Sequence, residues 1–288
     1  MKRLLLCVAI ALLLAAGCLT PGTPPAGGSR LQILSPSEPF PLFEGEGVMT
    51  EIITGETPIL PMNFSLGYVV IDPGNGTPPH RLLPTSELIY VDAGTARVRC
   101  DHGTVTAERE ELVLIPESVL QSIDSVGDAQ LRYVSAIQPP YSDEIEIAGD
   151  ALHSCGIQTD SVPIVVRDPG EGIEWDFDTG TVIYTLINPV LMPEKEIPID
   201  YSVAFAEIRP GGHVVKNRLI GRTEVLYVIE GEIEISSPGD ATIRVPAGSA
   251  GYIPPGCIKE YRNSGEGNAQ ILSFVDPAWT LEGSELLD

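Results

Sequence analysis

An internal repeat constrains this chain more than any other feature. The segment PGNGTPPHRLLPTSELIYVDAG, residues 73–94, returns without a gap as PGGHVVKNRLIGRTEVLYVIEG, residues 210–231. A repeat of this length defines the architecture before any other pattern is considered, because each copy is one structural unit. With 288 residues, the chain holds two copies of a domain of ordinary size. The matching residues, all at one constant offset, include Pro73 and Pro210, Gly74 and Gly211, Arg81 and Arg218, Leu82 and Leu219, Glu87 and Glu224, Tyr90 and Tyr227, and Gly94 and Gly231.

Alternating hydrophobicity within each copy predicts short β-strands. The chain has 29 Gly and 26 Pro, and no stretch after its N-terminus keeps a helical period. Short strands without intervening helices indicate an all-β sandwich or barrel. Alternation places Glu87, Ile89 and Val91 on one face of a strand and Leu88 with Tyr90 on the other. We expect the first face to line a barrel interior, and the second to be covered by a neighbouring sheet or by the other barrel.

The repeat resembles the first motif of the cupin superfamily. That motif contains a His-x-His pair, then a Glu, six further residues and a Gly. Glu87 to Gly94 and Glu224 to Gly231 each enclose six residues, as the motif requires. The resemblance covers roughly residues 40–280 and implies a bicupin, with two tandem double-stranded β-helix barrels of the jelly-roll type.

The second cupin motif is better kept in the second copy. The segment GSAGYIPPGCIKEYRN, residues 248–263, fits this motif, whereas the first copy keeps only Pro116. The resemblance and the repeat together suggest how the chain is divided. We expect a signal peptide at 1–17, a flexible tether at 18–30, a first barrel at 31–140, a connector at 141–160, a second barrel at 161–282 and a tail at 283–288.

Both copies have lost residues that cupins use to hold a metal ion. In that family, two His and the Glu of the first motif join a His of the second motif to bind Mn, Fe, Ni, Cu or Zn. Leu82 and Leu219 cannot bind a metal, and the ammonium of Lys259 would repel one. The residues at the four positions are His80, Leu82, Glu87 and Gln121 in the first copy, and Asn217, Leu219, Glu224 and Lys259 in the second.

The two copies therefore predict different pockets. In the second copy we expect a metal-free pocket in which Lys259 pairs with Glu224, because a lone buried carboxylate is costly. Two alternatives stay open for the first copy. Either His80, Glu87 and Gln121 bind one divalent metal ion with water completing its shell, or His80 hydrogen-bonds Glu87 in a polar pocket without metal.

Arg81 and Arg218 occupy matching positions beside these residues. Their guanidinium groups suit a carboxylate or a phosphate ligand. Because strand alternation aims them away from the barrel interior, the sequence favours structural ion pairs instead.

The N-terminus, MKRLLLCVAIALLLAAGCLT, has the pattern of a secretory signal. Lys2 and Arg3 precede an apolar core, and small residues precede Cys18. The segment resembles a lipoprotein box with Cys18 as the lipidated residue, followed by the Pro/Gly/Ser-rich tether. We expect an extracytoplasmic protein anchored to the cell membrane through Cys18; plain secretion and an uncleaved signal anchor are the alternatives.

Charge and cysteine content restrict the partners. The net charge of −23 disfavours binding to nucleic acid. Cys100, Cys155 and Cys257 remain after the signal, without a CxxC spacing, which argues against a zinc site and allows at most one internal disulfide.

Three functions stay open from the sequence. The leading hypothesis is a non-catalytic binding protein for a small polar ligand or a protein partner. The second is a metal-dependent cupin enzyme, of the dioxygenase, isomerase or decarboxylase type, that uses the first barrel. The third is a structural surface lipoprotein with filled pockets. Cupin barrels host many unrelated activities, so the fold does not choose among these functions.

Overall fold

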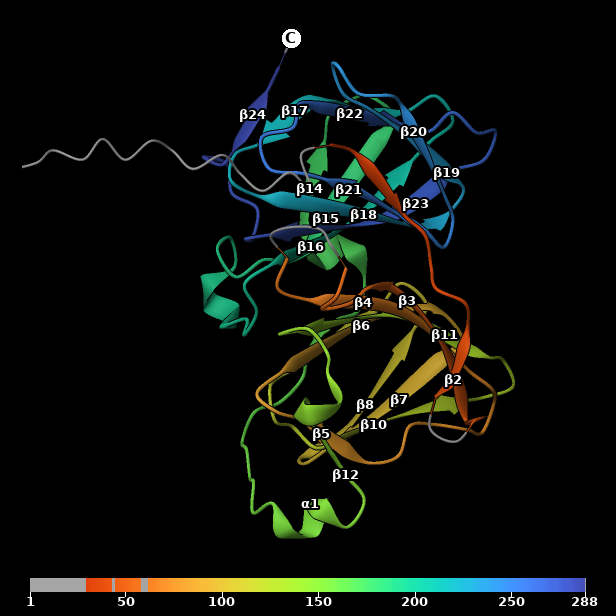
Figure 1. Cartoon of the computed structure of the whole chain (residues 1–288), viewed down its shortest axis with the longest axis vertical. Helices are drawn as coiled ribbons and strands as arrows, with labels where there is room; N and C mark the ends of the chain where they lie inside the picture. Colours follow the sequence, from red (N-terminus) through yellow and green to blue (C-terminus); the bar gives the residue numbers. More distant parts are fainter. Residues whose placement is uncertain (1–29, 43–44, 58–61, 288) are drawn as a thin grey trace, which may run out of the picture.

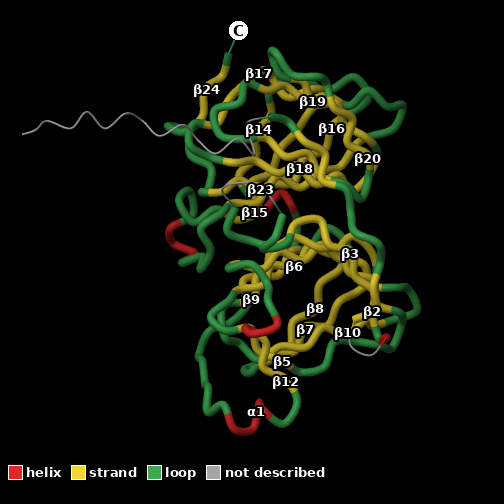
Figure 2. The backbone as a smooth tube through the Cα atoms, in the orientation of Figure 1, coloured by secondary structure: helices red, strands yellow, loops and turns green. Residues whose placement is uncertain are grey.

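Two β-barrels lie one above the other along the long axis of the molecule (Figure 1). The structure is a computed structural model that describes residues 30–42, 45–57 and 62–287. The predicted signal, Cys18 and nearly all of the tether lie outside the described residues. Strands account for both barrels, and helical turns occur only in the connections between strands (Figure 2). None of the described helices is long and apolar enough to cross a membrane.

The first barrel consists of two antiparallel sheets. The seven-stranded sheet, in the order β13-β9-β6-β11-β4-β3-β2, comprises β2 (Phe40–Leu42), β3 (Gly47–Ile53), β4 (Ser65–Ile71), β6 (Ser86–Ala93), β9 (Leu112–Ile115), β11 (Leu131–Gln138) and β13 (Ile164–Val166). The five-stranded sheet, in the order β12-β5-β10-β7-β8, comprises β5 (His80–Leu82), β7 (Thr95–Cys100), β8 (Gly103–Glu108), β10 (Gln121–Val126) and β12 (Glu146–Ala148).

The second barrel has the same construction. The seven-stranded sheet, in the order β1-β21-β18-β23-β16-β15-β14, comprises β1 (Gln32–Leu34), β14 (Ile173–Asp176), β15 (Thr181–Ile187), β16 (Ser202–Ile208), β18 (Thr223–Glu230), β21 (Ala250–Ile253) and β23 (Ala269–Asp276). The five-stranded sheet, in the order β20-β19-β22-β17-β24, comprises β17 (His213–Leu219), β19 (Glu232–Ser236), β20 (Ile243–Pro246), β22 (Lys259–Arg262) and β24 (Ser284–Leu286).

The two sheet orders correspond strand by strand. Each barrel has a seven-stranded and a five-stranded sheet, and the duplicated motif occupies β5 and β6 in one barrel and β17 and β18 in the other. Gly94 and Gly231 end the two motifs with φ of 77° and 79°, a conformation that glycine adopts without strain. The predicted all-β fold of two tandem jelly-roll barrels is confirmed.

Helices are short and lie outside the barrels. In the described part of the chain the one α-helix, α1, follows β12 and lies at the end of the first barrel that faces away from the second (Figure 1). The helical segments are α1 (Ala151–Ser154) and the 3₁₀ turns Asp143–Ile145, Pro169–Glu171 and Pro193–Lys195.

The edges of the sheets differ from the expected boundaries. β1, which precedes the first barrel in sequence, pairs with β21 of the second barrel, where it is the red-orange strand in Figure 1. β13 reciprocally pairs with β9 of the first barrel. The connector at 141–160 contributes β12 to the first barrel, and the tail at 283–288 contributes β24 to the second. Each of these strands is three residues long, which is too short for an alternating pattern to be recognised in the sequence. They cover sheet edges whose backbone groups would otherwise be unpaired.

The strand that carries the duplicated Glu in each barrel, β6 or β18, is buried on both faces along most of its length. In β6, Ile89 and Val91 belong to the core inside the first barrel, whereas Leu88 and Tyr90 belong to a core shared by both barrels. β18 shows the same alternation, because Leu226 lies in the core of the second barrel and Tyr227 in the shared core. The outer faces of the two seven-stranded sheets therefore pack against each other.

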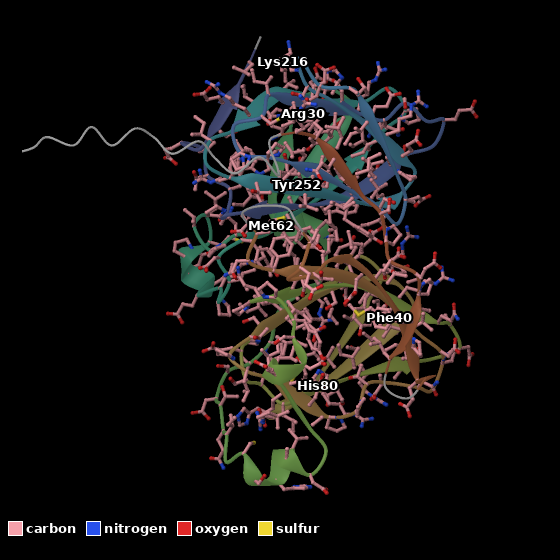
Figure 3. The ribbon with its side chains drawn as sticks, viewed as in Figure 1. Arg30, Phe40, Met62, His80, Lys216 and Tyr252 are labelled. Atoms are coloured by element: carbon pink, nitrogen blue, oxygen red, sulfur yellow. The ribbon has the colours of Figure 1, made fainter. Side chains whose placement is uncertain are left out.

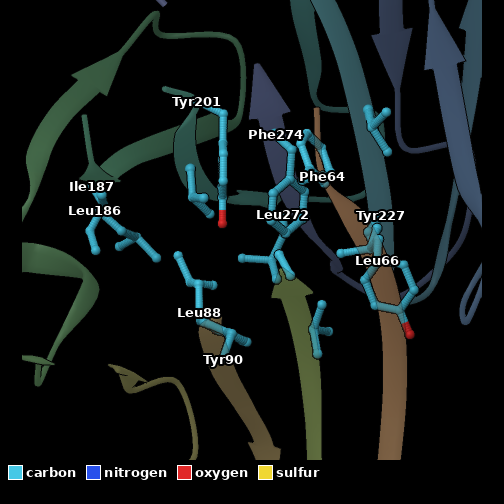
Figure 4. Close-up of a cluster of buried hydrophobic side chains, with 14 of the residues drawn as sticks. Phe64, Leu66, Leu88, Tyr90, Leu186, Ile187, Tyr201, Tyr227, Leu272 and Phe274 are labelled. Atoms are coloured by element: carbon cyan, nitrogen blue, oxygen red, sulfur yellow. The ribbon is translucent and has the colours of Figure 1, made fainter. Parts of the chain in front are cut away.

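The shared core is built symmetrically (Figure 4). Phe64 and Tyr201 occupy equivalent positions of the repeat, and their ring centroids lie 4.8 Å apart. On either side, Tyr90 stacks on Phe205 at 6.2 Å and Tyr227 stacks on Tyr68 at 6.4 Å. Tyr68 is equivalent to Phe205 and Tyr90 to Tyr227, so each contact occurs twice with the barrels exchanged. This reciprocity is the property of an isologous interface around a two-fold axis, here formed within one chain.

Two hydrogen bonds from a backbone amide to a side chain follow the same two-fold symmetry at the edge of the interface. The amide of Asn63 donates to Asp276 Oδ2 at 2.8 Å, and the amide of Asp200 donates to Gln138 Oε1 at 2.7 Å. Asn63 is equivalent to Asp200, and Gln138 is equivalent to Asp276 once a one-residue insertion in the second copy is allowed for. The C-terminal residue of β11 or β23 in each barrel thus accepts a hydrogen bond from the segment just before β16 or β4 of the other barrel.

We predict that Phe64→Ala destabilises the whole chain. Phe64 is 1% exposed between the barrels, so its truncation should lower the free energy of unfolding by about 3–5 kcal/mol, measured by urea denaturation. As a control, Leu281→Ala, at a side chain 60% exposed, should cost less than about 0.5 kcal/mol. Equal stability of the two variants would show that the shared core contributes little.

Candidate functional site

Each barrel encloses a cavity at the predicted site. The cavity of the first barrel measures about 310 Å³ and is lined by His80, Leu82 and Glu87, and Figure 3 labels two of its lining residues, Phe40 and His80. The cavity of the second barrel measures about 390 Å³ and is lined by the equivalent Asn217, Leu219 and Glu224, together with Lys259. Both carboxylates of the repeat therefore point inward.

In the first barrel, the amide group of Gln121 lies between His80 and Glu87. Gln121 Nε2 is 3.0 Å from His80 Nε2 and donates to Glu87 Oε2 at 2.6 Å. His80 Nδ1 lies 2.9 Å from the carbonyl oxygen of Pro78, which can only accept, so Nδ1 carries the proton and Nε2 accepts from Gln121. Gln121 therefore links His80 to Glu87, a contact that neither alternative from the sequence included.

This arrangement does not fit the metal ion that the resemblance implies. An amide N–H group is a hydrogen-bond donor, and here it occupies the space between the two side chains that would have to bind the ion. Turning the amide to present its oxygen would place that oxygen against the carboxylate of Glu87. In the described part of the chain, no group of three or more His, Cys, Asp or Glu residues is arranged to hold a metal.

In the second barrel, Lys259 forms the expected ion pair with Glu224. Lys259 Nζ lies 2.7 Å from Glu224 Oε2, and their side chains are only 2% and 8% exposed. Lys259 is on β22, at the position where the cupin motif has its second-motif His. Its positive charge stands where a metal ion would, so it neutralises the buried carboxylate and excludes a second cation.

A serine supports the carboxylate in each barrel. Ser135 Oγ on β11 donates to Glu87 Oε1 at 2.7 Å, and Ser273 Oγ on β23 donates to Glu224 Oε1 at 2.9 Å. The two serines are equivalent in the repeat. Each carboxylate therefore has one oxygen held by the neighbouring strand and the other held by Gln121 or Lys259.

A buried tyrosine also lines each cavity. Tyr133 and Tyr261 are 2% and 3% exposed, and neither hydroxyl has a hydrogen-bond partner within the described ranges. Burial, followed by the negative charge of Glu87 or Glu224, raises the pKa of each tyrosine well above its usual value. Both hydroxyls therefore stay protonated at neutral pH and face space that a ligand can use.

Aromatic side chains form much of the wall of the second cavity. Trp175 on β14 and Trp279 after β23 contact each other edge to face, with centroids 5.3 Å apart, and Phe177 lines the same space. Two hydrogen bonds hold the backbone of Trp279 in place. Its backbone N–H donates to Ser202 Oγ at 3.0 Å, and its backbone carbonyl accepts from the side-chain amide of Asn188 at 2.9 Å. Predicted site residue Asn217 lines this cavity, but its amide donates to the carbonyl of Val215 at 2.8 Å.

The repeated arginines form structural ion pairs. Arg81 binds Asp101 through two hydrogen bonds of 2.8 and 2.7 Å and also donates to the carbonyl of Ser118. Arg218 pairs with Glu285 at 2.6 Å, which ties β17 to β24. Each pair lies within one barrel, so neither arginine is available as a ligand clamp.

The three described cysteines are free thiols. Cys257 Sγ lies 3.3 Å from Ser237 Oγ, and burial raises its pKa. Burial also raises the pKa of Cys100 to about 11. Both thiols are therefore protonated at neutral pH and have little nucleophilic character.

Several pocket residues were missed by the sequence reasoning. Ser135, Tyr133 and the two tryptophans lie outside the cupin motifs, and Tyr261 lies within the second motif but not at one of its ligand positions. One signal was available, because SAIQPP near the end of the first copy corresponds to SFVDPA in the second. Extending the repeat across a one-residue insertion would have paired Ser135 with Ser273 and Tyr141 with Trp279. The ungapped comparison stopped before these positions.

Comparison with known proteins agrees with this architecture. Residues 204–275 match the cupin domain family, and residues 65–154 match the AraC-like ligand binding domain family. No curated protein matches the chain.

Among solved structures, the chain is similar to two oxalate decarboxylases. For the Bacillus subtilis enzyme the TM-score is 0.70 at 16% identity, over 92% of this chain and 81% of that one. For the Lactobacillus farciminis enzyme in its formate complex the TM-score is 0.68 at 15% identity, over 88% of each chain. Identity at this level shows a shared fold and no more. The cupin-domain match over residues 204–275 and the fold shared with these enzymes agree with an architecture of two tandem cupin-like barrels.

We predict that Lys259→Met is strongly destabilising. The change leaves Glu224 buried without its counter-charge, which should lower the free energy of unfolding by about 3–5 kcal/mol. The double variant Lys259→Met/Glu224→Gln removes both charges and should recover most of this loss, as measured in a double-mutant cycle by urea denaturation. A Lys259→Met variant as stable as the unaltered chain would contradict the ion pair.

The Arg81–Asp101 pair predicts a loss of stability in acid. Partial burial alone would raise the pKa of Asp101, but hydrogen bonds from Arg81 and the amide of Leu120 lower it overall. A lowered folded-state pKa contributes stability above the usual aspartate pKa of about 4, and this contribution is lost as pH falls through the folded-state value. Between pH 6 and pH 3, Asp101→Asn should therefore lose less unfolding free energy than the unaltered chain. Parallel pH profiles would argue against the pair.

Proposed function

We propose that this protein binds a small organic molecule in its second barrel, without a metal ion and without catalysis. The observation that carries the proposal is the Lys259–Glu224 ion pair at the base of an open cavity of about 390 Å³. That volume is within the range of small-molecule sites, about 300–1,000 Å³. The cavity also argues against the hypothesis of a structural protein with filled pockets.

The lining of the second cavity indicates the chemistry of the ligand. The Lys259–Glu224 pair is neutral as a unit, so it offers no net counter-charge to a buried ligand with a full charge of either sign. Lys259 has three N–H donors and Glu224 is its one ion-pair partner in the described chain, which leaves donors for an acceptor atom of the ligand. Trp175 and Trp279 offer flat apolar walls. We infer an uncharged molecule with a flat apolar body and a carbonyl or hydroxyl oxygen.

Further features support a binding role outside the cytoplasm. The family matched by residues 65–154 is named for ligand binding. The secretory pattern before Cys18 supports export, with lipid anchoring at Cys18 as the proposed attachment. A tether rich in Pro, Gly and Ser would hold the barrels away from the membrane surface.

The metal-dependent alternative rests on the structural neighbours, which are oxalate decarboxylases. It requires a cation in the first barrel, where Gln121 instead joins His80 to Glu87. Elemental analysis of protein purified without chelators tests this directly. We expect clearly sub-stoichiometric Mn, Fe, Ni, Cu and Zn, and one tightly held ion per chain would favour the enzyme.

Tryptophan fluorescence should report ligand binding directly. The chain has two tryptophans, Trp175 and Trp279, and both line the second cavity. We predict that a matching ligand from a panel of uncharged aromatic ketones, amides and lactones shifts the emission. At a concentration of one hundred times Kd it should also raise the unfolding free energy by about 2.7 kcal/mol.

Three controls accompany this measurement. Added chelator should leave binding unchanged, and carboxylic acids of the same shape should bind more weakly. Trp279→Leu should weaken binding while the fold is kept. If no uncharged compound binds, or if binding requires added metal, the proposal fails.

A further inference from the structure

We propose that the first barrel is a second binding site, which takes a positively charged ligand, a small aliphatic diamine, in place of an uncharged one. Among the described residues, its cavity is lined by four carboxylates and by no Lys or Arg. In the described residues none of the four forms an ion pair, whereas Glu224 in the second barrel is neutralised by Lys259. The carboxylates are Glu51, Glu87, Asp143 and Glu146.

The inner end of the cavity offers acceptors for an ammonium group. Glu87 is 7% exposed and is bonded only to the neutral side chains of Gln121 and Ser135, so its charge is not compensated. His80 Nε2 faces the amide of Gln121, and its Nδ1 lies 2.9 Å from the carbonyl oxygen of Pro78. The Tyr133 hydroxyl is buried, has no partner among the described residues and lines the same cavity, so its oxygen can accept an N–H.

The remainder of the cavity suits a short hydrocarbon chain that ends in a second charge. Val69, Leu82 and Ile123 provide apolar walls next to Glu87. Asp143 and Glu146 are more exposed and lie on the 3₁₀ turn and strand that follow the barrel, where the Tyr141 hydroxyl donates to Glu146 at 2.7 Å. A molecule with ammonium groups at both ends and methylene groups between them can pair with the buried Glu87 and with a more exposed acid, while its methylene groups contact the apolar walls of the same cavity.

The same features disfavour other ligands. A carboxylate ligand would be repelled by four uncompensated acids. The acids are spread along the cavity, and together with the other described residues they form no group of three that could hold one metal ion. The net charge of −23 also raises the local concentration of cations near the protein.

Isothermal titration calorimetry with the full chain tests the proposal, with 1,4-diaminobutane as the probe. We expect saturable one-to-one binding that weakens with added salt. Butylamine should bind at least about tenfold more weakly, because it lacks the second ion pair, and 1,4-butanediol should not bind. Tryptophan emission should not change, because both tryptophans line the other cavity.

Variants separate the two ends of the site. Glu87→Gln, which is isosteric, and the rim variant Asp143→Asn/Glu146→Gln should each weaken diamine binding by about tenfold or more. Because Asp143 is exposed, the rim variant tests the proposal even if Glu87→Gln disturbs folding. Glu117→Gln, at an exposed position outside the cavity, removes one charge and should leave binding unchanged.

Three results would overturn the proposal. The first is equal binding of 1,4-butanediol and 1,4-diaminobutane, and the second is diamine affinity that the rim variant does not alter. The third is stoichiometric binding of a divalent metal ion in place of the diamine. None of these outcomes bears on the second barrel, whose ligand is followed separately by tryptophan fluorescence.

Discussion

Packing of the two seven-stranded sheets against each other is the interaction on which this structure depends. In β6 and β18, the residues that follow the inward-pointing acid are apolar on both faces of the strand, from Leu88 to Val91 and from Val225 to Ile229. A barrel alone would expose Tyr90 or Tyr227, with their neighbours, to water. Pairing the barrels around Phe64 and Tyr201 buries both surfaces at once. Exchange of β1 and β13 then covers one edge of each barrel with a strand from the segment leading into the other, so that the two halves interlock.

Symmetry in this interface allows the two interiors to differ. Contacts between the barrels involve the outer faces, whereas Glu87 and Glu224 point inward and are free to acquire different partners. In one barrel a neutral amide and a serine hold the carboxylate, which keeps its charge. In the other, Lys259 cancels that charge. One duplicated acid therefore gives a negatively charged cavity in the first barrel and a neutral, aromatic cavity in the second.

Sequence reasoning succeeded where it used the repeat. The constant offset between Glu87 and Glu224 predicted two barrels, and strand alternation placed both acids inside. The Lys259–Glu224 pair followed because a lone buried carboxylate is costly and the second copy places a lysine at the matching motif position. The reasoning failed for short edge strands such as β1, whose three residues carry no usable period and whose partners lie more than two hundred residues away. It also could not show that Gln121 would join His80 to Glu87, since an amide side chain can either donate or accept.

By itself, the sequence determined the fold class, the duplication, the inward direction of the two acids and the loss of imidazoles in both copies. These follow from local spacing and from the chemistry of single residues. Only the tertiary structure decided which strand completes which barrel, that equivalent aromatic residues meet in reciprocal pairs, and which carboxylates share one cavity without a counter-charge. Those properties depend on distances between residues far apart in the chain, and the order of residues along a chain does not specify such distances.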